Sequence, residues 1–564
     1  MSLSATLVGA SLLMGLAFDA SCTARAADVV PDEPSKRTEA LRKDGVDLAT
    51  YAAVRGEGLG HSEVMTFVSA LSDGIGARLM GSPNMQKAYD WSLATLTRLG
   101  AHGAHLEDFG EFGLSWRQNN AWMRMSAPDS MVFVAQAGPW SVSTHGSVEG
   151  DVVPVEINNE ADFAKYRGHL KRKVVFLGPL RPVPTPIEPF AVRYTDAALE
   201  SGEVSEPVRK YYQTIQPHIR ERSETDRFRL SRNAFLQREG VLAIVFPSAD
   251  GERGGGTGDL AIDNGALAGR PWVAEERPAF PVIFTAIEDF GRVWRMTQAG
   301  TPVRVQFNVD TQDLAKHEHA FNVVADIPGS DPALHSQIVL VGGHLDSWAS
   351  GEGATDDGAG VAAALEVARI LQALHIQPRR TIRIILFGGE EEGLLGSEGY
   401  AKSHLGSVPR STEPDQLLLT RESWRRPIGP VKVLPEYDLL SAAYNVDHGG
   451  GRIRAVYTAG NPKLAAVYRR WIAPLKDLGV AAVFDEPSWP ADQSTFTNLG
   501  IPGILFLQDP LDYSSRSHHT NMDTMERIVA TDLAQVATVL TIFAIDSANR
   551  DELLPRTKDA EVSR

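Results

Sequence analysis

Apolar and polar residues along the 564-residue chain follow different spacings in successive regions. Residues 34–100 carry mainly helical spacing, and one helix there has a Ser-Pro start at 82–83 and ends at Gly100. Between about 130 and 312, short apolar β-type runs alternate with loops rich in Pro and Gly. These runs are VVFLG (174–178), VLAIVF (241–246), PVIF (281–284) and VRVQFNV (303–309). The pattern predicts an inserted β-rich domain.

From residue 318 onward, apolar runs of strand length alternate with stretches of helical spacing. The predicted strands are 337–343, 381–389 and 502–508, and the predicted helices are 356–374, 461–479 and 530–548. Such alternation indicates an α/β domain, with a mostly parallel central sheet and helices on both faces. Ligands of such sheets bind at the carboxyl ends of the strands. Residues 403–436 are rich in Pro and charge and predict a long surface excursion.

Composition narrows the class of protein. Hydrophobic residues make up 43% and charged residues 22%, which is typical of a globular chain with more than one domain. The formal net charge of −16 disfavours nucleic acid and anionic membranes as partners. We therefore expect no nucleic-acid partner and no stable membrane insertion, while the oligomeric state stays open.

The amino terminus has the pattern of a secretory signal. Residues 5–17 form an apolar run that is short for a membrane span, and Ala-Arg-Ala at 24–26 is a suitable cleavage site. No Lys or Arg precedes the apolar run. Cleavage would remove Cys22, the only cysteine, so the mature chain would have no disulfide. We expect a periplasmic or secreted protein, with lipidation of Cys22 as the alternative.

These patterns predict five regions. They are a signal peptide (1–26), the amino-terminal part of the main domain (27–129), the inserted domain (130–312), the main part of the α/β domain (313–550) and a carboxyl-terminal tail (551–564).

Charged side chains gather where the predicted strands end or the following helices begin. They are His344, Asp346, Asp356, Asp357, Glu390, Glu391, Glu392, Asp447, His518 and His519. Carboxylates that converge on one rim repel each other unless cations lie between them. A mixed His and carboxylate set suits zinc, and two bridged ions could activate a shared water. Adjacent Glu390 and Glu391 could divide the work, one binding metal and the other accepting a proton.

Each of these groups has an ordinary structural explanation when it is considered alone. A His-x-Asp pair is often a surface hydrogen bond, and acidic residues such as Asp356 and Glu390 commonly begin helices. The HEH segment at 317–319 is expected to be exposed. No G-x-S-x-G motif supports a serine hydrolase. Only the combination at successive strand ends indicates a metal site.

Five segments in this order resemble the co-catalytic zinc exopeptidases, the family of bacterial leucyl aminopeptidase, carboxypeptidase Q and glutamate carboxypeptidase. The segments read GGHLDSW, GATDDGAG, LFGGEEEGLLGSEGY, YNVD and SHHTNMDT, within residues 318–548. GARLMGSP, in 76–83, resembles the amino-terminal part of the same family, and the insert resembles its protease-associated domain.

The resemblance implies two zinc ions and a role for each matching residue. One zinc would be held by His344 and Asp447, the other by Glu391 and His519, and Asp356 would bridge them. Glu390 would be the general base, and Asp346 would orient His344. Further roles implied are His518 as the alternative to His519, Tyr513 as a helper for the oxyanion, and Asp357 in the turn that presents Asp356.

The implied function is hydrolysis of terminal peptide bonds in peptide substrates. Aminopeptidase action is favoured, with carboxypeptidase or dipeptidase action as the nearest alternative. A glutaminyl cyclase and a non-catalytic receptor-like module on the same scaffold are further alternatives. Gln493 stands where a related motif has histidine, a difference that would affect the substrate pocket rather than the metals.

Overall fold

The computed structural model describes residues 44–183, 185, 187–248, 256, 258–262, 270–557 and 562–563. The predicted signal peptide and Cys22 lie outside the described residues. Among the described residues, the strands are β1 His102–Ala127, β2 Met131–Val132, β3 Ala135–Ala137, β4 Val148–Glu156, β5 Val174–Gly178, β6 Ala243–Pro247, β7 Val282–Thr285, β8 Arg304–Ile327, β9 Ile338–His344, β10 Thr381–Phe387, β11 Gly406–Ser407, β12 Val431–Val433, β13 Leu440–Asn445, β14 Ile453–Tyr457, β15 Ala482–Phe484, β16 Gly503–Gln508 and β17 Val562–Ser563.

The α-helices in this part of the chain are α2 Leu48–Gly60, α3 Val64–Ser69, α4 Pro83–Arg98, α5 Phe163–Tyr166, α6 Asp196–Ser201, α7 Glu206–Lys210, α8 Arg222–Glu239, α9 Ile287–Gln298, α10 Ala359–Ala373, α11 Leu395–Tyr400, α12 Pro462–Ile472, α13 Gln493–Asn498 and α14 Ala530–Asn549.

One large twisted sheet passes through the molecule, in the order β15-β14-β16-β13-β9-β10-β8-β4-β5-β6-β7-β3. Strands β16, β13, β9 and β10 are parallel to one another, and β14 and β8 flank them in antiparallel orientation. Every residue of β9 is buried, which explains its unbroken apolar sequence. Helices α10 and α14 pack together on one face of these strands. The predicted α/β class is therefore confirmed.

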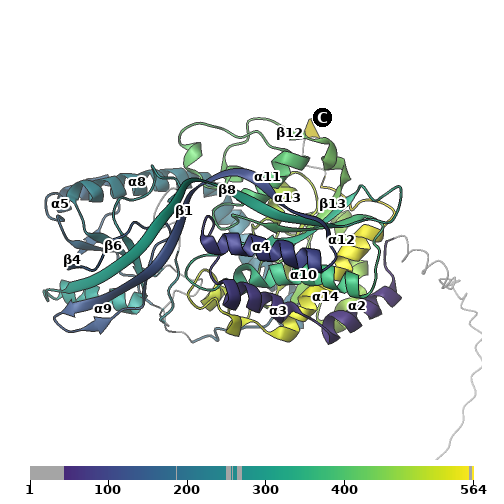
Figure 1. The fold of residues 1–564 in the computed structure, drawn as a ribbon, viewed down its shortest axis with the longest axis horizontal. Helices are drawn as coiled ribbons and strands as arrows, with labels where there is room; N and C mark the ends of the chain where they lie inside the picture. The colour runs from purple at the N-terminus through teal and green to yellow at the C-terminus, as the bar shows by residue number, and fades with distance from the viewer. Residues whose placement is uncertain are drawn as a thin grey trace, which may run out of the picture.

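A long antiparallel pair, β1 and β8, joins the two halves of the molecule (Figure 1). Its register runs from His102 opposite Asp326 at one end to Ala127 opposite Arg304 at the other. The sequence predicted only residues 303–309 of this pair. Register shifts near Gly110 and Gly113 interrupt the alternation of apolar and polar residues, so the strand pattern is weak there.

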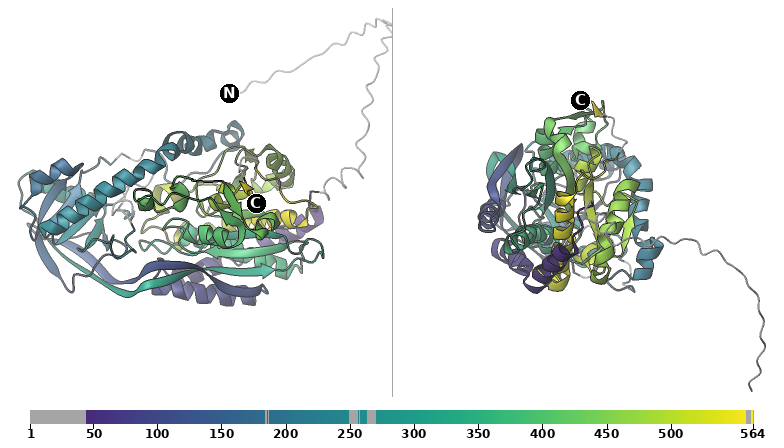
Figure 2. Two further views of the ribbon diagram at one scale, coloured as in Figure 1. Left: turned by 90° about the horizontal axis from the view of Figure 1, so that it is seen from above. Right: turned by 90° about the vertical axis from the view of Figure 1, so that its right-hand side faces the viewer.

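The half that contains residues 131–303 is built on β4, β5, β6 and β7, which are parallel to one another. Helix α8 runs from this half toward the other (Figure 2). The polar stretch that precedes α8 is helical, and part of it packs on the other half. Leu199, Val204 and Val208 of this stretch share one apolar cluster with Tyr457 and Leu507.

Helix α14 is the centre of the α/β half. It is long and apolar enough to cross a membrane by length and composition, and 89% of its most apolar window is buried inside the protein. Phe543 in this helix contacts the rings of Tyr444, Tyr468, Trp471 and Phe506 at centroid distances of 5.2–6.0 Å. The helix is thus a core element against which the sheet packs.

Replacing Phe543 with Ala should lower the free energy of unfolding by about 3–5 kcal/mol, because it leaves a cavity among four rings. The measurement is the melting temperature of the purified protein. Leu48→Ala is the matched control, since Leu48 is 55% exposed, and should change stability by less than about 0.5 kcal/mol. An unchanged melting temperature in F543A would contradict this packing.

Candidate metal centre

The candidate ligands lie at the carboxyl ends of adjacent strands. His344 is the last residue of β9, Glu390 and Glu391 follow β10, and Asp447 follows β13. Asp356 lies in the turn Ala354–Gly358 that leads into α10, where its own backbone is extended rather than helical, with φ −136° and ψ 87°. Because β13, β9 and β10 are parallel neighbours, these side chains meet at one edge of the sheet.

The first candidate metal position is formed by His344, Asp356 and Asp447. The Nε2 atom of His344 lies 3.2 Å from Oδ1 of Asp356 and 3.6 Å from Oδ1 of Asp447. One donor atom from each residue lies within 4.8 Å of the other two. This spacing leaves room for one ion among the three atoms.

The second candidate position lies on the other side of Asp356. The Nε2 atom of His519 is 3.0 Å from Oε2 of Glu391 and 3.3 Å from Oδ2 of Asp356. Asp356 therefore directs one oxygen toward each position, as a bridging carboxylate would. His518 is farther away, with its Nε2 atom 3.9 Å from Asp356, and its ring is tilted against that of His519 with 3.8 Å between the centroids.

The residues fit a pair of divalent cations by their charge and by their unused atoms. Asp356 Oδ2 and Glu391 Oε1 are buried and accept no hydrogen bond from the described residues. Burial raises the pKa of Glu391 to about 8 and that of Glu390 to about 7. Buried carboxylates in such numbers need positive charge to remain ionised. The mixture of imidazole and carboxylate donors is typical of zinc sites.

Asp346 connects the first candidate ligand to the Glu390–Glu391 turn. The Nδ1–H of His344 donates to the carbonyl of Asp346 at 3.0 Å, while the Asp346 carboxylate is 3.9 Å from the same atom. That carboxylate accepts the backbone N–H groups of Glu390 and Glu391 at 3.3 and 3.2 Å. His344 is thus oriented by the backbone of Asp346, and the side chain positions the two glutamates.

Asp357 stabilises the turn that carries Asp356. Its two carboxylate oxygens accept the backbone N–H groups of His344 and Gly360 at 3.1 and 2.9 Å. It does not belong to the ligand group of His344, Asp356 and Asp447. The two adjacent aspartates therefore have separate tasks, one facing the metal positions and the other binding the backbone.

Arg78, which the sequence analysis did not single out, positions the loop between His344 and Asp356. Its guanidinium is fully buried and donates to the carbonyls of Leu345, Glu352 and Gly353 at 2.7–2.9 Å. The resemblance of the GARLMGSP segment to the family indicated that this region matters. It did not identify Arg78 itself, because arginine side chains are usually exposed.

The half with residues 131–303 also supports the second metal position. The N–H of Ile262 donates to the carbonyl of His519 at 3.2 Å, and the N–H of Leu260 donates to Asn521 Oδ1 at 2.7 Å. On the other side, Ser350 Oγ donates to the same His519 carbonyl at 3.0 Å. His519 adopts a left-handed φ of 59°, and these contacts hold it in that conformation.

Tyr513 and Arg421 complete the surroundings of the ligands. Tyr513 is buried against His518, with 4.8 Å between ring centroids, on the side of Asp356 and Asp447. Arg421 Nη2 lies 3.4 Å from Glu390 Oε1. The sequence indicated Arg421 only as part of a surface excursion, whereas the structure places it beside the proposed base.

His519→Ala should reduce bound zinc from about two ions to about one per chain, because the second position loses the imidazole that lies nearest to Glu391 and Asp356. His518→Ala should retain both, since His518 is the more distant ring. Elemental analysis of the purified variants after zinc loading measures this difference. Equal zinc content in the two variants, or loss only in H518A, would contradict the assignment.

Comparison with known proteins gives the same picture. Residues 322–544 match peptidase family M28. Carboxypeptidase Q of Rattus norvegicus is 27% identical over 280 residues, which are 50% of this chain and 52% of that protein. A probable leucine aminopeptidase 2 of Aspergillus fumigatus is 31% identical over 163 residues, 29% of this chain and 28% of that protein. The chain thus spans about half the length, or less, of these curated relatives.

Solved structures extend the similarity over almost the whole chain. A peptidase M28 precursor from Shewanella amazonensis aligns with a TM-score of 0.62 and 25% identity, covering 92% of this chain and all of that one. A zinc aminopeptidase from Bacillus subtilis aligns with a TM-score of 0.50 and 16% identity, covering 88% and 98%. The second shows the likeness of fold alone.

Proposed function

Since the chain belongs to peptidase family M28 through residues 322–544, we propose that it is a zinc-dependent exopeptidase that hydrolyses terminal peptide bonds. The observation that carries the proposal is the place of Asp356 between two groups that each hold a histidine and a second carboxylate. His344 and Asp447 would hold one zinc, and Glu391 and His519 the other. When bound, the two ions polarise a carbonyl and lower the pKa of a water.

Glu390 is the proposed general base. It lies beside the proposed ligand Glu391, is only 6% exposed, and has its backbone held by the Asp346 carboxylate. Its carboxylate can accept a proton from the attacking water and return it to the leaving amine nitrogen. Tyr513 would stabilise negative charge on the carbonyl oxygen.

We propose that the enzyme removes the residue at the amino end of the substrate. The sequence favours aminopeptidase action, and carboxypeptidase or dipeptidase action is its rival. A dipeptide could be a substrate for an aminopeptidase, a carboxypeptidase or a dipeptidase, because its one peptide bond lies next to both ends of the molecule. We therefore propose peptides with a free amino terminus as substrates, and dipeptides as the first to assay. Release of ammonia from Gln-initiated peptides would instead indicate a cyclase.

We propose that residues 130–312 form a protease-associated domain whose task includes supporting the His519 loop. The hydrogen bonds from Leu260 and Ile262 favour this role. Export of the chain, with cleavage after residue 26, stays a prediction from the sequence.

Glu390→Gln should reduce kcat by about 100- to 10,000-fold, because the amide cannot accept the proton. Zinc content should stay near that of the unaltered protein, since Glu391 and the histidines are intact. Glu149→Gln is the control and should keep normal turnover, because this carboxylate pairs with Arg304 on the surface of the other half. Full activity in E390Q would refute the assignment of the base.

A further inference from the structure

Arg421 has the geometry of a substrate-binding residue. Its side chain is 18% exposed, and Nη2 approaches Glu390 Oε1 at 3.4 Å. Within the described residues, Glu390 is the one carboxylate at ion-pair distance from this guanidinium. The contact is long for a charged hydrogen bond and uses one of five N–H donors. A base that must accept a proton is a poor permanent partner for an arginine, so a second carboxylate fits better there.

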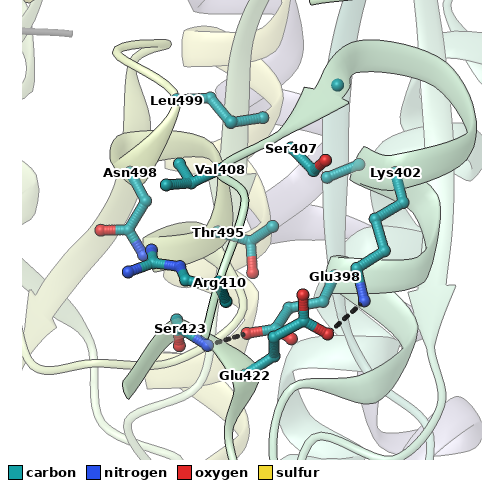
Figure 3. A pocket seen from close by; sticks show the side chains of 12 residues that line it. Glu398, Lys402, Ser407, Val408, Arg410, Glu422, Ser423, Thr495, Asn498 and Leu499 are labelled. Carbon is teal, nitrogen blue, oxygen red and sulfur yellow. Dashed lines mark hydrogen bonds and ion pairs between the residues drawn. The ribbon is translucent and has the colours of Figure 1, made fainter. Parts of the chain in front are cut away.

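The backbone around Arg421 is firmly held, as Figure 3 shows for its neighbours. The N–H of Ser423 donates to Glu398 at 3.0 Å, and Lys402 pairs with Glu422 at 2.6 Å. Both partners come from the segment that begins with α11. The excursion is thereby held beside a small pocket, and the backbone next to Arg421 is fixed.

The surroundings of Arg421 are cationic and aromatic. The guanidinium carbons of Arg421 and Arg222 lie 5.3 and 4.9 Å from the ring of Trp424, and Arg220 Nε donates to the Trp424 carbonyl at 3.2 Å. Burial raises the pKa of Tyr211, and the positive charge of Arg421 and Arg222 opposes that shift, so the tyrosine lies near both. In a chain of net charge −16, such a cluster attracts a negatively charged ligand.

Two aromatic side chains, Tyr211 and Trp489, extend from this cluster. Tyr211 contacts Trp489 at 5.4 Å between ring centroids. Trp489 in turn borders a cavity of about 200 Å³ that also contains His448, the residue after Asp447. Tyr211, which lies near Arg421, is therefore linked through Trp489 to a cavity that borders the residue next to Asp447.

We propose that Arg421 binds the α-carboxylate of the residue that leaves when the terminal peptide bond is cut. The inference rests on the proposed exopeptidase function and specifies its substrate class as dipeptides with a free carboxyl end. In a dipeptide, the carboxylate carbon is three bonds from the carbonyl carbon under attack, roughly 3–4 Å away. Glu390 would act at this carbonyl carbon, and Arg421 lies 3.4 Å from Glu390. The arginine is therefore at a suitable distance to bind the carboxylate of the same dipeptide. The carboxylate would replace Glu390 as the partner of Arg421.

The test compares the dipeptide Leu-Ala with Leu-Ala amide, using zinc-loaded protein. The unaltered enzyme should prefer the free acid by about 10- to 100-fold in kcat/KM, the value of a charged hydrogen-bonded pair. In Arg421→Gln this ratio should fall to near one, mostly through loss of activity on the free acid. Arg421→Lys should recover part of the preference. Arg425→Gln, a nearby arginine on the same excursion, should keep the full ratio.

The outcomes separate this inference from the function on which it rests. If zinc-loaded protein cleaves neither substrate nor longer peptides, the proposed function fails. If it cleaves both dipeptides equally, or if R421Q loses activity equally on both, Arg421 acts only through Glu390 and the carboxylate site is refuted. Zinc content and melting temperature are measured for each variant, and Arg421→Lys supplies the comparison if Arg421→Gln does not fold.

Discussion

Buried negative charge at the carboxyl ends of β9, β10 and β13 is the constraint on which the site depends. Asp356, Glu391 and Asp447 converge there, and burial raises the pKa of Glu391 and of Asp447. Two histidines alone cannot balance this charge, and two carboxylate oxygens have no hydrogen-bond donor among the described residues. A pair of divalent cations resolves both difficulties with the same atoms. The arrangement is costly without metal and stable with it, which couples the order of these loops to metal binding.

Contacts with neighbouring residues hold the ligand-bearing loops together, although the carboxylates on these loops repel one another. Arg78 contributes a buried positive charge and binds the carbonyls of the loop between the first ligand and Asp356. Asp346 and Asp357 accept backbone N–H groups, so their own charges are compensated without competing for metal. The second half of the molecule reaches across to the His519 loop through Leu260 and Ile262. The candidate ligands thus come from the α/β half, and the other half supports one of their loops.

The sequence could predict much of the fold and of the ligand set because strand ends are local features. The strands β9, β10 and β16 were expected within a residue or two of their bounds, and the charged groups beside them follow from the α/β pattern. Strand β1 could not be predicted, since bulges interrupt its alternation. Arg421 could not be placed either, because its position depends on pairs such as Lys402–Glu422 that join distant segments. Tertiary contacts of this kind leave no periodic signal in the chain.

The central claim is that two ions occupy the positions on either side of Asp356. Anomalous diffraction at the zinc absorption edge, from crystals of the zinc-loaded protein, tests it most directly. The account predicts two peaks about 3.5–4 Å apart, one beside His344 and Asp447 and the other beside Glu391 and His519. A single peak, or peaks located away from Asp356, would contradict it.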